Sequence, residues 1–258
     1  MAVTSATVGA ITTLTLDSPH NRNALSTVLV EELTAGLRHA SENPDVRAVV
    51  LTHTGGTFCA GADLSEAGGS VESRTAQMLG LLRLIVETPK PVVGKIDGHV
   101  RAGGVGLVGA CDIVVAGPGS TFALTEARLG LAPSIISLTV LPRLDSRAAS
   151  RYFLTGEKFG AHEAEAIGLI SEATQDPDAT LVEILDSLRQ GSPQGLAASK
   201  GLTTASVLAG FDARGRQLSE QSARLFASEQ AREGMMSFLQ KRPPEWAGVK
   251  PAEQPGEK

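Results

Sequence analysis

The chain has 258 residues, of which 42% are hydrophobic, so it can form one large domain or one domain with a small appendage. Its net charge of −5 and its pI of about 5.6, without a run of basic residues, argue against a nucleic-acid-binding surface. The apolar runs are too short to span a membrane, so we expect no membrane partner.

The first half of the chain alternates between strands and helices. Leu29, Leu33 and Leu37 recur every four residues, which predicts a helix that Ser26 can cap. The other expected elements here are strands at 8–16, 47–53, 91–96 and 112–116, helices at 76–87 and 103–110, and a mobile polar loop at 65–74. This alternation is typical of an α/β layer.

The second half is predominantly helical. Expected helices cover 147–154, 161–167, 180–189, 194–208 and 216–240, and Pro243-Pro244 ends the last of them. We therefore expect an α/β core over residues 1–190, a helical region over 191–243 and a disordered tail over 244–258.

The cysteines and histidines give no sign of a metal site. Cys59 and Cys111 lie among small or apolar residues, and neither they nor the five histidines have metal-binding spacing. We expect no secretory segment, and hence buried, reduced thiols in a cytoplasmic protein. We also expect no metal and no separate cofactor.

Two glycine-rich turns precede an acidic residue, Glu126. They span 58–64 (FCAGADL) and 97–106 (DGHVRAGGVG), and small residues let the backbone approach a ligand closely. If each turn aims a backbone N–H at one carbonyl oxygen, the pair forms an oxyanion hole. An acid beside such a hole suffices for chemistry that passes through an enolate.

Residues 104–109 also match the dinucleotide-binding pattern G-x-G-x-x-G. The helix that would follow is too short for that motif, and the second strand does not end in an acid. We therefore interpret Gly106 and Gly109 as residues that let a short helix pack closely against its neighbours. His99, in the second turn, is expected to be a turn residue beside the pocket.

With these motifs in this order, the sequence resembles the crotonase superfamily, the enoyl-CoA hydratases and isomerases, over nearly its whole length. Residues 21–26 (NRNALS) resemble the family's early coenzyme A contact, and the two glycine-rich turns resemble its oxyanion turns. Residues 154–157, 164–169 and 232–242 resemble its later helices.

The resemblance implies an α/β fold: a crotonase-like spiral of ββα units followed by a C-terminal helical trimerisation region, in a homo-trimer or homo-hexamer. It places the oxyanion N–H groups on Ala62 and Gly103, and the proton-transferring acid on Glu126. An acyl-CoA substrate would bind through its coenzyme A moiety to Arg22, Asn23, Ala24, Leu25, Ala60, Gly61, Ala62, Asp63, Leu64, Phe238 and Lys241. The last two would come from a neighbouring subunit.

Three departures from the family pattern bear on the reaction. Two-glutamate hydratases carry an acid three residues after the second oxyanion glycine, where this chain has Gly106. Arg101 replaces an apolar residue before the glycines. Ser134-Ile135-Ile136 stands where hydratases often carry another glycine run. If another group replaces the absent acid, His99 and Arg101 are the first candidates.

The expected activity is enoyl-CoA hydration in fatty-acid or branched-chain acyl-CoA metabolism. One alternative is an enoyl-CoA delta-isomerase, in which Glu126 alone takes a proton from one carbon and returns it to another. Decarboxylation or another enolate reaction is also open. A further alternative is a weakly catalytic acyl-CoA-binding homologue.

Overall fold

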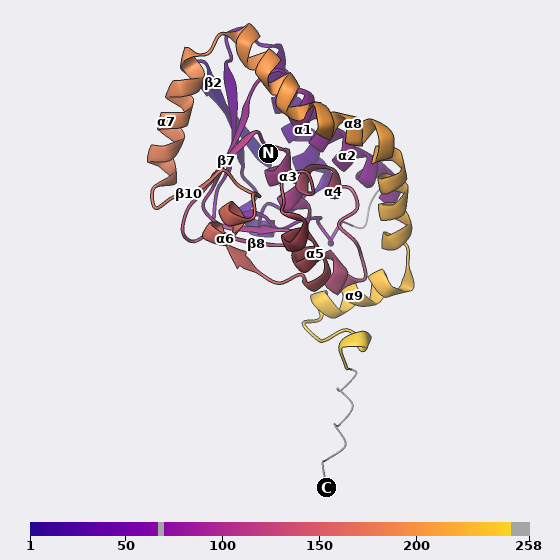
Figure 1. Cartoon of the computed structure of the whole chain (residues 1–258). Coiled ribbons are helices and arrows are strands. Elements are labelled where there is room, and N and C mark those ends of the chain that lie inside the picture. Colours follow the sequence, from indigo (N-terminus) through magenta and orange to yellow (C-terminus); the bar gives the residue numbers. More distant parts are fainter. Residues whose placement is uncertain (67–69, 249–258) are drawn as a thin grey trace.

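The structure is a computed structural model that describes residues 1–66 and 70–248 (Figure 1). Its strands form two sheets. The first has the order β1 (Val3–Val8), β2 (Ile11–Leu16), β3 (Ala48–His53), β5 (Val92–Ile96), β7 (Ile113–Ala116) and β10 (Glu172–Ala173). The second has the order β4 (Thr57–Cys59), β6 (His99–Arg101), β8 (Thr121–Ala123) and β9 (Phe159–Gly160).

From β3 to β8, successive strands alternate between the two sheets. β3, β5 and β7 are parallel neighbours in the first sheet, and the strands that follow them, β4, β6 and β8, are parallel neighbours in the second. Parallel pairing requires a crossover, which α2 (Val71–Glu87) and α3 (Gly103–Ala110) supply. This arrangement confirms the expected spiral of ββα units.

The core lies between the sheets and the helices that cover them. Phe58, Val100 and Phe122, at the centres of β4, β6 and β8, are fully buried. The predicted helix is α1 (Thr27–Glu42), and the Ser26 hydroxyl caps it by accepting a hydrogen bond from the Leu29 N–H at 3.2 Å. α1 packs on β1 and β2 of the first sheet. α7 (Pro177–Gln190) covers the opposite face of that sheet (Figure 1).

The C-terminal region differs from the prediction in where its helix breaks. The sequence predicted a break near 209–215, but α8 runs without interruption from Pro193 to Phe226. Val207 and Phe211 are buried in the main core, so packing against α2 holds this stretch helical. The break comes at Ala227–Ser228, where the Ser228 hydroxyl caps α9 (Glu229–Leu239).

Two other boundaries also differ. The predicted strand at 8–16 is the second half of a hairpin, because Gly9 and Ala10 adopt positive φ angles and turn the chain between β1 and β2. The predicted loop at 65–74 is shorter, since α2 begins at Val71. Residues 67–69 of that loop and 249–258 of the predicted tail lie outside the described residues, whereas Glu245–Gly248 form a 3₁₀ turn, η3.

The remaining elements are short. They are η1 (Pro19–Asn21), η2 (Glu126–Leu129), α4 (Ser137–Val140), α5 (Ser146–Thr155) and α6 (Ala161–Ala166). In the described ranges, no helix combines the length and the hydropathy required to cross a membrane.

Candidate active site

Three adjacent strand ends bring the predicted catalytic residues to one edge of the second sheet. β4, β6 and β8 are parallel, so their carboxyl ends lie on the same side. Ala62 follows the end of β4, Gly103 follows β6, and Glu126 follows β8. Ligands commonly bind at the carboxyl edge of parallel strands, where loops meet.

The two glycine-rich turns contact each other directly. A Cβ atom placed on Gly61 would lie 2.8 Å from the Ala102 Cβ, and one on Gly103 would lie 3.9 Å from the Gly61 Cα. Gly61 also has a φ of +90°, which disfavours any other residue. The Ala102 N–H donates to the Ala123 carbonyl at 3.0 Å and so joins the second turn to the end of β8.

Both predicted oxyanion donors are available. Neither the Ala62 N–H nor the Gly103 N–H donates a hydrogen bond to another described residue. The first turn is held instead by its carbonyl group, since the Leu25 N–H donates to the Gly61 oxygen at 2.8 Å. Two free donors on adjoining turns can bind one developing oxyanion.

Ala102 adopts a backbone conformation that suits glycine. Its φ of 47° and ψ of −121° are sparsely populated by residues with a Cβ. Such strain persists only where the surroundings determine it. Here the adjoining Gly61 and the hydrogen bond to Ala123 provide that constraint. The sequence showed no signal for this strain, because alanine gives no hint of a positive φ.

Glu126 is a buried acid at the first position of η2. Its side chain is 8% exposed, and its Oε2 has no hydrogen-bond partner among the described residues. Burial raises the pKa of Glu126 from 4.5 to about 7, although a hydrogen bond from its own backbone N–H acts in the opposite direction. A carboxyl group with this pKa can give or take a proton near neutral pH.

The predicted coenzyme A residues of the first half lie together. The Ala60 N–H donates to the Arg22 carbonyl at 3.1 Å, and Leu25 pairs with Ala62 in an isolated bridge. Ala24, Gly61 and Leu64 lie in the same two segments. The structure thus brings residues 22–25 to the first oxyanion turn.

Asn23 has a structural role within this group. Its side chain is fully buried and forms three hydrogen bonds, accepting from the Ser18 N–H and donating to the Thr54 and Thr57 carbonyls. The whole residue is 0% exposed, so Asn23 holds residues 22–25 in place and offers no surface to a ligand in this structure.

The carboxylates nearest the first turn, those of Asp63 and Glu66, already accept hydrogen bonds from neighbouring residues. Burial acts to raise the pKa of Asp63, but hydrogen bonds from Ser65 and Asn21 hold it below its ordinary value. The Glu66 carboxylate accepts hydrogen bonds from the Thr27 N–H and hydroxyl at the start of α1. Both carboxylates stabilise local structure, which leaves Glu126 as the acid suited to proton transfer.

Gly106 and Gly109 allow close helix packing, as predicted. A Cβ on Gly109 would lie 2.8 Å from the Thr139 carbonyl oxygen of α4. A Cβ on Gly106 would lie 2.8 Å from the Ile136 Cβ and 3.5 Å from the Leu82 Cδ1. The position at which two-glutamate hydratases carry an acid is therefore enclosed by apolar side chains.

His99 and Arg101 meet at Thr121 on β8. The Thr121 hydroxyl lies 2.9 Å from the His99 Nδ1 and accepts a hydrogen bond from the Arg101 Nη2 at 2.8 Å. Both residues alternate with buried Val100 along β6, so they share the opposite face of that strand. Burial lowers the pKa of Arg101, which is half-buried.

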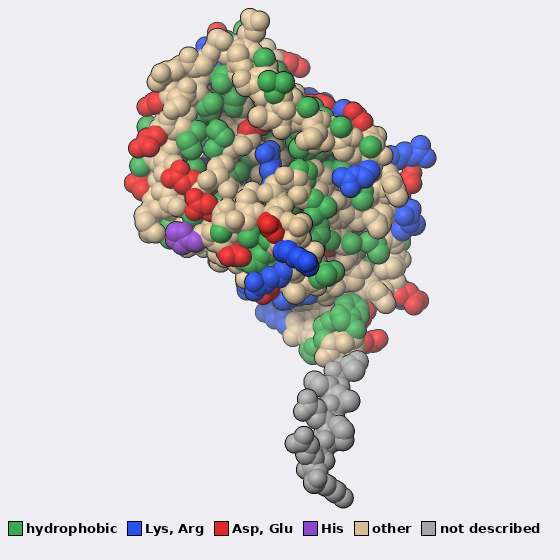
Figure 2. All heavy atoms as spheres, viewed as in Figure 1, with side chains coloured by type: hydrophobic (Ala, Val, Ile, Leu, Met, Phe, Trp, Pro, Cys, Tyr) green, Lys and Arg blue, Asp and Glu red, His purple; other side chains and the backbone are tan. Residues whose placement is uncertain are grey.

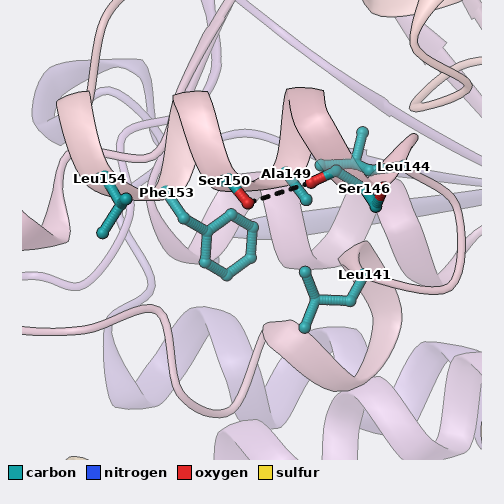
Figure 3. Close-up of a pocket in the computed structure, with 7 residues that line it drawn as sticks. All are labelled: Leu141, Leu144, Ser146, Ala149, Ser150, Phe153 and Leu154. Atoms are coloured by element: carbon teal, nitrogen blue, oxygen red, sulfur yellow. Dashed lines mark hydrogen bonds between the residues drawn. The ribbon is translucent and has the colours of Figure 1, made fainter.

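Phe238 lies in the last turn of α9 and Lys241 follows the end of that helix, and both are exposed in the single chain. Their contact with coenzyme A from a neighbouring subunit stays a prediction. An apolar hollow lies elsewhere, between α4 and α5, where Leu141 and Phe153 face each other (Figure 3). It contains none of the predicted catalytic residues.

Among residues 1–66 and 70–248, no group of three or more His, Cys, Asp or Glu side chains gathers in a way that could hold a metal ion. On the face shown in Figure 2, acidic and basic side chains are interspersed with apolar ones.

Comparison with known proteins places this architecture in a family. The sequence profile of the enoyl-CoA hydratase/isomerase family matches residues 6–250, and the chain therefore belongs to this family, whose fold is the crotonase fold. Mevalonyl-coenzyme A hydratase sidH from Aspergillus fumigatus is 34% identical over 244 residues, which cover 90% of each chain. The 2,3-dehydroadipyl-CoA hydratase from Escherichia coli is 31% identical, covering 91% of this chain and 94% of the relative.

A solved structure of an enzyme named as an enoyl-CoA hydratase is similar to this chain in both sequence and fold. The crystal structure of an enoyl-CoA hydratase from Mycobacterium avium is 59% identical, with a TM-score of 0.89 over 95% of this chain and 98% of that one.

Proposed function

We propose that this acyl-CoA enzyme stabilises a thioester enolate and that its reaction is the hydration of an enoyl-CoA. The observation that carries the proposal is the buried Glu126, with its pKa raised to about 7, at the same sheet edge as two turns whose N–H groups have no partner among the described residues. The thioester oxygen would accept hydrogen bonds from Ala62 and Gly103. Glu126 would transfer the proton at Cα.

The expected magnitudes suit this chemistry. One donor of an oxyanion hole is typically worth about 3–4 kcal/mol of transition-state stabilisation. A positioned acid or base contributes roughly 10²–10⁴-fold. No nucleophile is required, and the buried thiols Cys59 and Cys111, whose pKa values burial raises to about 12, are unsuited to that role.

Hydration is the first choice because the overall motif pattern is hydratase-like and because two relatives with specific names, sidH and the 2,3-dehydroadipyl-CoA hydratase, are named hydratases. The acyl substrate would belong to fatty-acid or branched-chain metabolism. The second candidate is enoyl-CoA isomerisation, and the apolar surroundings of Gly106 favour it, because one carboxylate can move a proton between two carbons without water.

The direct test is Glu126→Gln. The amide keeps the shape of the side chain but cannot exchange protons, so kcat with a panel of enoyl-CoA esters should fall by about 10²-fold or more while acyl-CoA affinity is retained. Unchanged turnover would place the acid elsewhere. If the wild type binds acyl-CoA but turns over none of the esters, the chain is the weakly catalytic acyl-CoA-binding homologue.

The pH profile separates the two reactions. If Glu126 delivers a proton during hydration, kcat/KM for an enoyl-CoA should fall above about pH 7, since the protonated form is needed. If Glu126 first removes a proton, as in isomerisation, kcat/KM should instead rise as the pH passes about 7.

We further propose that Lys241 contacts the coenzyme A phosphates of a neighbouring subunit, since phosphates favour cationic donors and the chain as a whole is acidic. Lys241→Glu should raise the KM for acyl-CoA and make it less sensitive to salt. An unchanged KM would remove Lys241 from the site.

The proposed assembly is a homo-trimer or homo-hexamer. The proposed compartment is the cytoplasm, although a matched relative from mouse, methylglutaconyl-CoA hydratase, is mitochondrial.

A further inference from the structure

A single apolar side chain occupies the space next to Gly106. Ile136 precedes α4, is 4% exposed, and lies so close to Gly106 that a Cβ there would be 2.8 Å from its own Cβ. Leu82 of α2, which is fully buried, also borders this space, and its Cδ1 would lie 3.5 Å from a Cβ on Gly106. A side chain at position 106 would therefore require Ile136 to move.

The backbone around this contact leaves little room for such a movement. The Thr139 hydroxyl donates to the Gly106 carbonyl at 3.0 Å, which ties α4 to α3. One turn further along α3, Gly109 lies against the Thr139 and Val140 backbone. The two helices are thus in backbone contact, and Ile136 has little freedom to withdraw.

The sequence pattern indicates that the contact between Gly106 and Ile136 bears on the reaction. Two-glutamate hydratases place an acid at the position of Gly106 and often glycines at the positions of 134–136. In this chain, position 106 is glycine and position 136 is isoleucine. Compared with two-glutamate hydratases, the larger side chain is at position 136 instead of position 106. The hydrocarbon side chain of Ile136 thus stands where those enzymes have a carboxyl group.

We propose that Ile136 is a specificity-determining residue that sets the ratio of hydration to isomerisation. The inference rests on the proposed function. In hydration, the C2=C3 π bond breaks, water oxygen bonds to C3, C2 gains a proton, and a base takes the proton that water loses. With Ile136 in place of a second acid, protonated Glu126 gives its proton to C2 from one carboxyl oxygen, and its other oxygen takes the proton that water loses. Isomerisation needs only the transfer of one proton from C4 to C2 through Glu126.

The test places an acid at position 106 and a glycine at position 136, the arrangement described for two-glutamate hydratases. Gly106→Glu alone should lower the melting temperature, because its side chain meets Ile136. Gly106→Glu combined with Ile136→Gly should fold better than Gly106→Glu and raise the ratio of hydration to isomerisation by about 10²-fold, the typical contribution of a positioned base. The matched control, Gly106→Gln with Ile136→Gly, has the same volume without the base and should leave the ratio near that of the wild type.

Two outcomes would overturn the inference. One is a folded double variant with the wild-type ratio, and the other is an equal rise in the glutamine control. If the double variant does not fold, Ile136→Gly alone gives the answer, because added acetate should enter the vacated space and raise hydration, whereas acetamide should not. Absence of this acetate effect also rejects the inference.

The same series separates this inference from the proposed function. Glu126→Gln tests whether Glu126 moves the Cα proton, measured as deuterium incorporation from D₂O. If Glu126→Gln leaves that exchange intact, the proposed function is wrong. If exchange is lost but the double variant keeps the wild-type ratio, only the role of Ile136 is wrong.

Discussion

Glu126 differs from Asp63 and Glu32 in the direction in which its surroundings shift its pKa. Asp63 and Glu32 accept hydrogen bonds that hold their pKa values below the ordinary range, although burial acts against this in Asp63. Glu126 is buried with one oxygen unpaired, so its charged form is disfavoured and its pKa is raised. A group useful for proton transfer is therefore a cost to stability once it ionises.

This cost predicts a pH-dependent stability. At pH values below 4.5, Glu126 is protonated in both the folded and the unfolded chain and makes no difference to stability. Between 4.5 and about 7, the unfolded chain binds fewer protons than the folded one, so the free energy of unfolding falls as the pH rises. The shift corresponds to a loss on the order of 3 kcal/mol.

Glu126→Gln should remove this dependence. The variant should be more stable than the wild type at pH 8 and similar to it below pH 4.5, measured by urea denaturation across the pH range. The matched control is Glu183→Gln on α7, where the side chain is exposed. If both variants follow the wild-type curve, the pKa of Glu126 is not raised in the folded chain.

At the scale of elements, α9 supports the turn that carries Glu126. A Cβ on Gly234 of α9 would lie 2.7 Å from the Leu129 Cα, and one on Gly130 would lie 2.7 Å from the Gln230 carbonyl. η2 and α9 thus touch backbone to backbone through glycines on both sides. The C-terminal helix, distant in sequence, fixes the position of the acid.

Gly234→Ala should disturb this support. The new methyl group meets the Leu129 backbone, which cannot rotate away, so we expect a destabilisation of about 1–3 kcal/mol and a lower kcat. Gly80→Ala is the control, because that exposed α2 glycine has no atom within 4 Å of a new Cβ. It should stabilise by up to about 1 kcal/mol. Similar effects of the two substitutions would contradict the proposed contact.

At the scale of the whole molecule, exposed apolar side chains surround the region of η2. Both α5 and α9 pack on η2. They carry Leu154, which is 76% exposed, and Phe238 and Leu239, which are 59% and 55% exposed. Leu154 also borders the apolar hollow of Figure 3. Large exposed apolar side chains on two helices that pack on the same turn are candidates for an interface, which supports the proposed homo-oligomer.

Leu154→Glu should weaken this assembly. A charged side chain in an apolar interface has no partner, so light scattering at micromolar concentration should show a smaller species than the wild type. Val182→Glu on α7, where the valine is 55% exposed, introduces the same chemistry on another face and should leave the mass unchanged. A wild type that is a stable monomer would reject the proposed oligomer, and equal masses for the wild type and Leu154→Glu would exclude Leu154 from the interface.

The sequence by itself determined most of the helices, the central strands of the first sheet and the order of the motifs, but not the short strands of the second sheet. Periodic leucines specified α1, and short Val- and Ile-rich runs specified β3, β5 and β7 of the first sheet, because local patterns of apolar residues reflect which parts of an element are buried. The glycine-rich turns and Glu126 could be identified because they lie in compact segments. Even Gly106 and Gly109 were interpreted correctly as packing residues.

Only the tertiary structure decided how distant segments complete the site. The continuity of α8 depends on burial against α2, and the pKa of Glu126 depends on its surroundings more than on its neighbours in sequence. The contacts of Ile136 with Gly106 and of Gly234 with η2 join residues that no local pattern connects. Burial and steric contact are properties of the folded chain, so the environment that sets the chemistry of this acid appears only there.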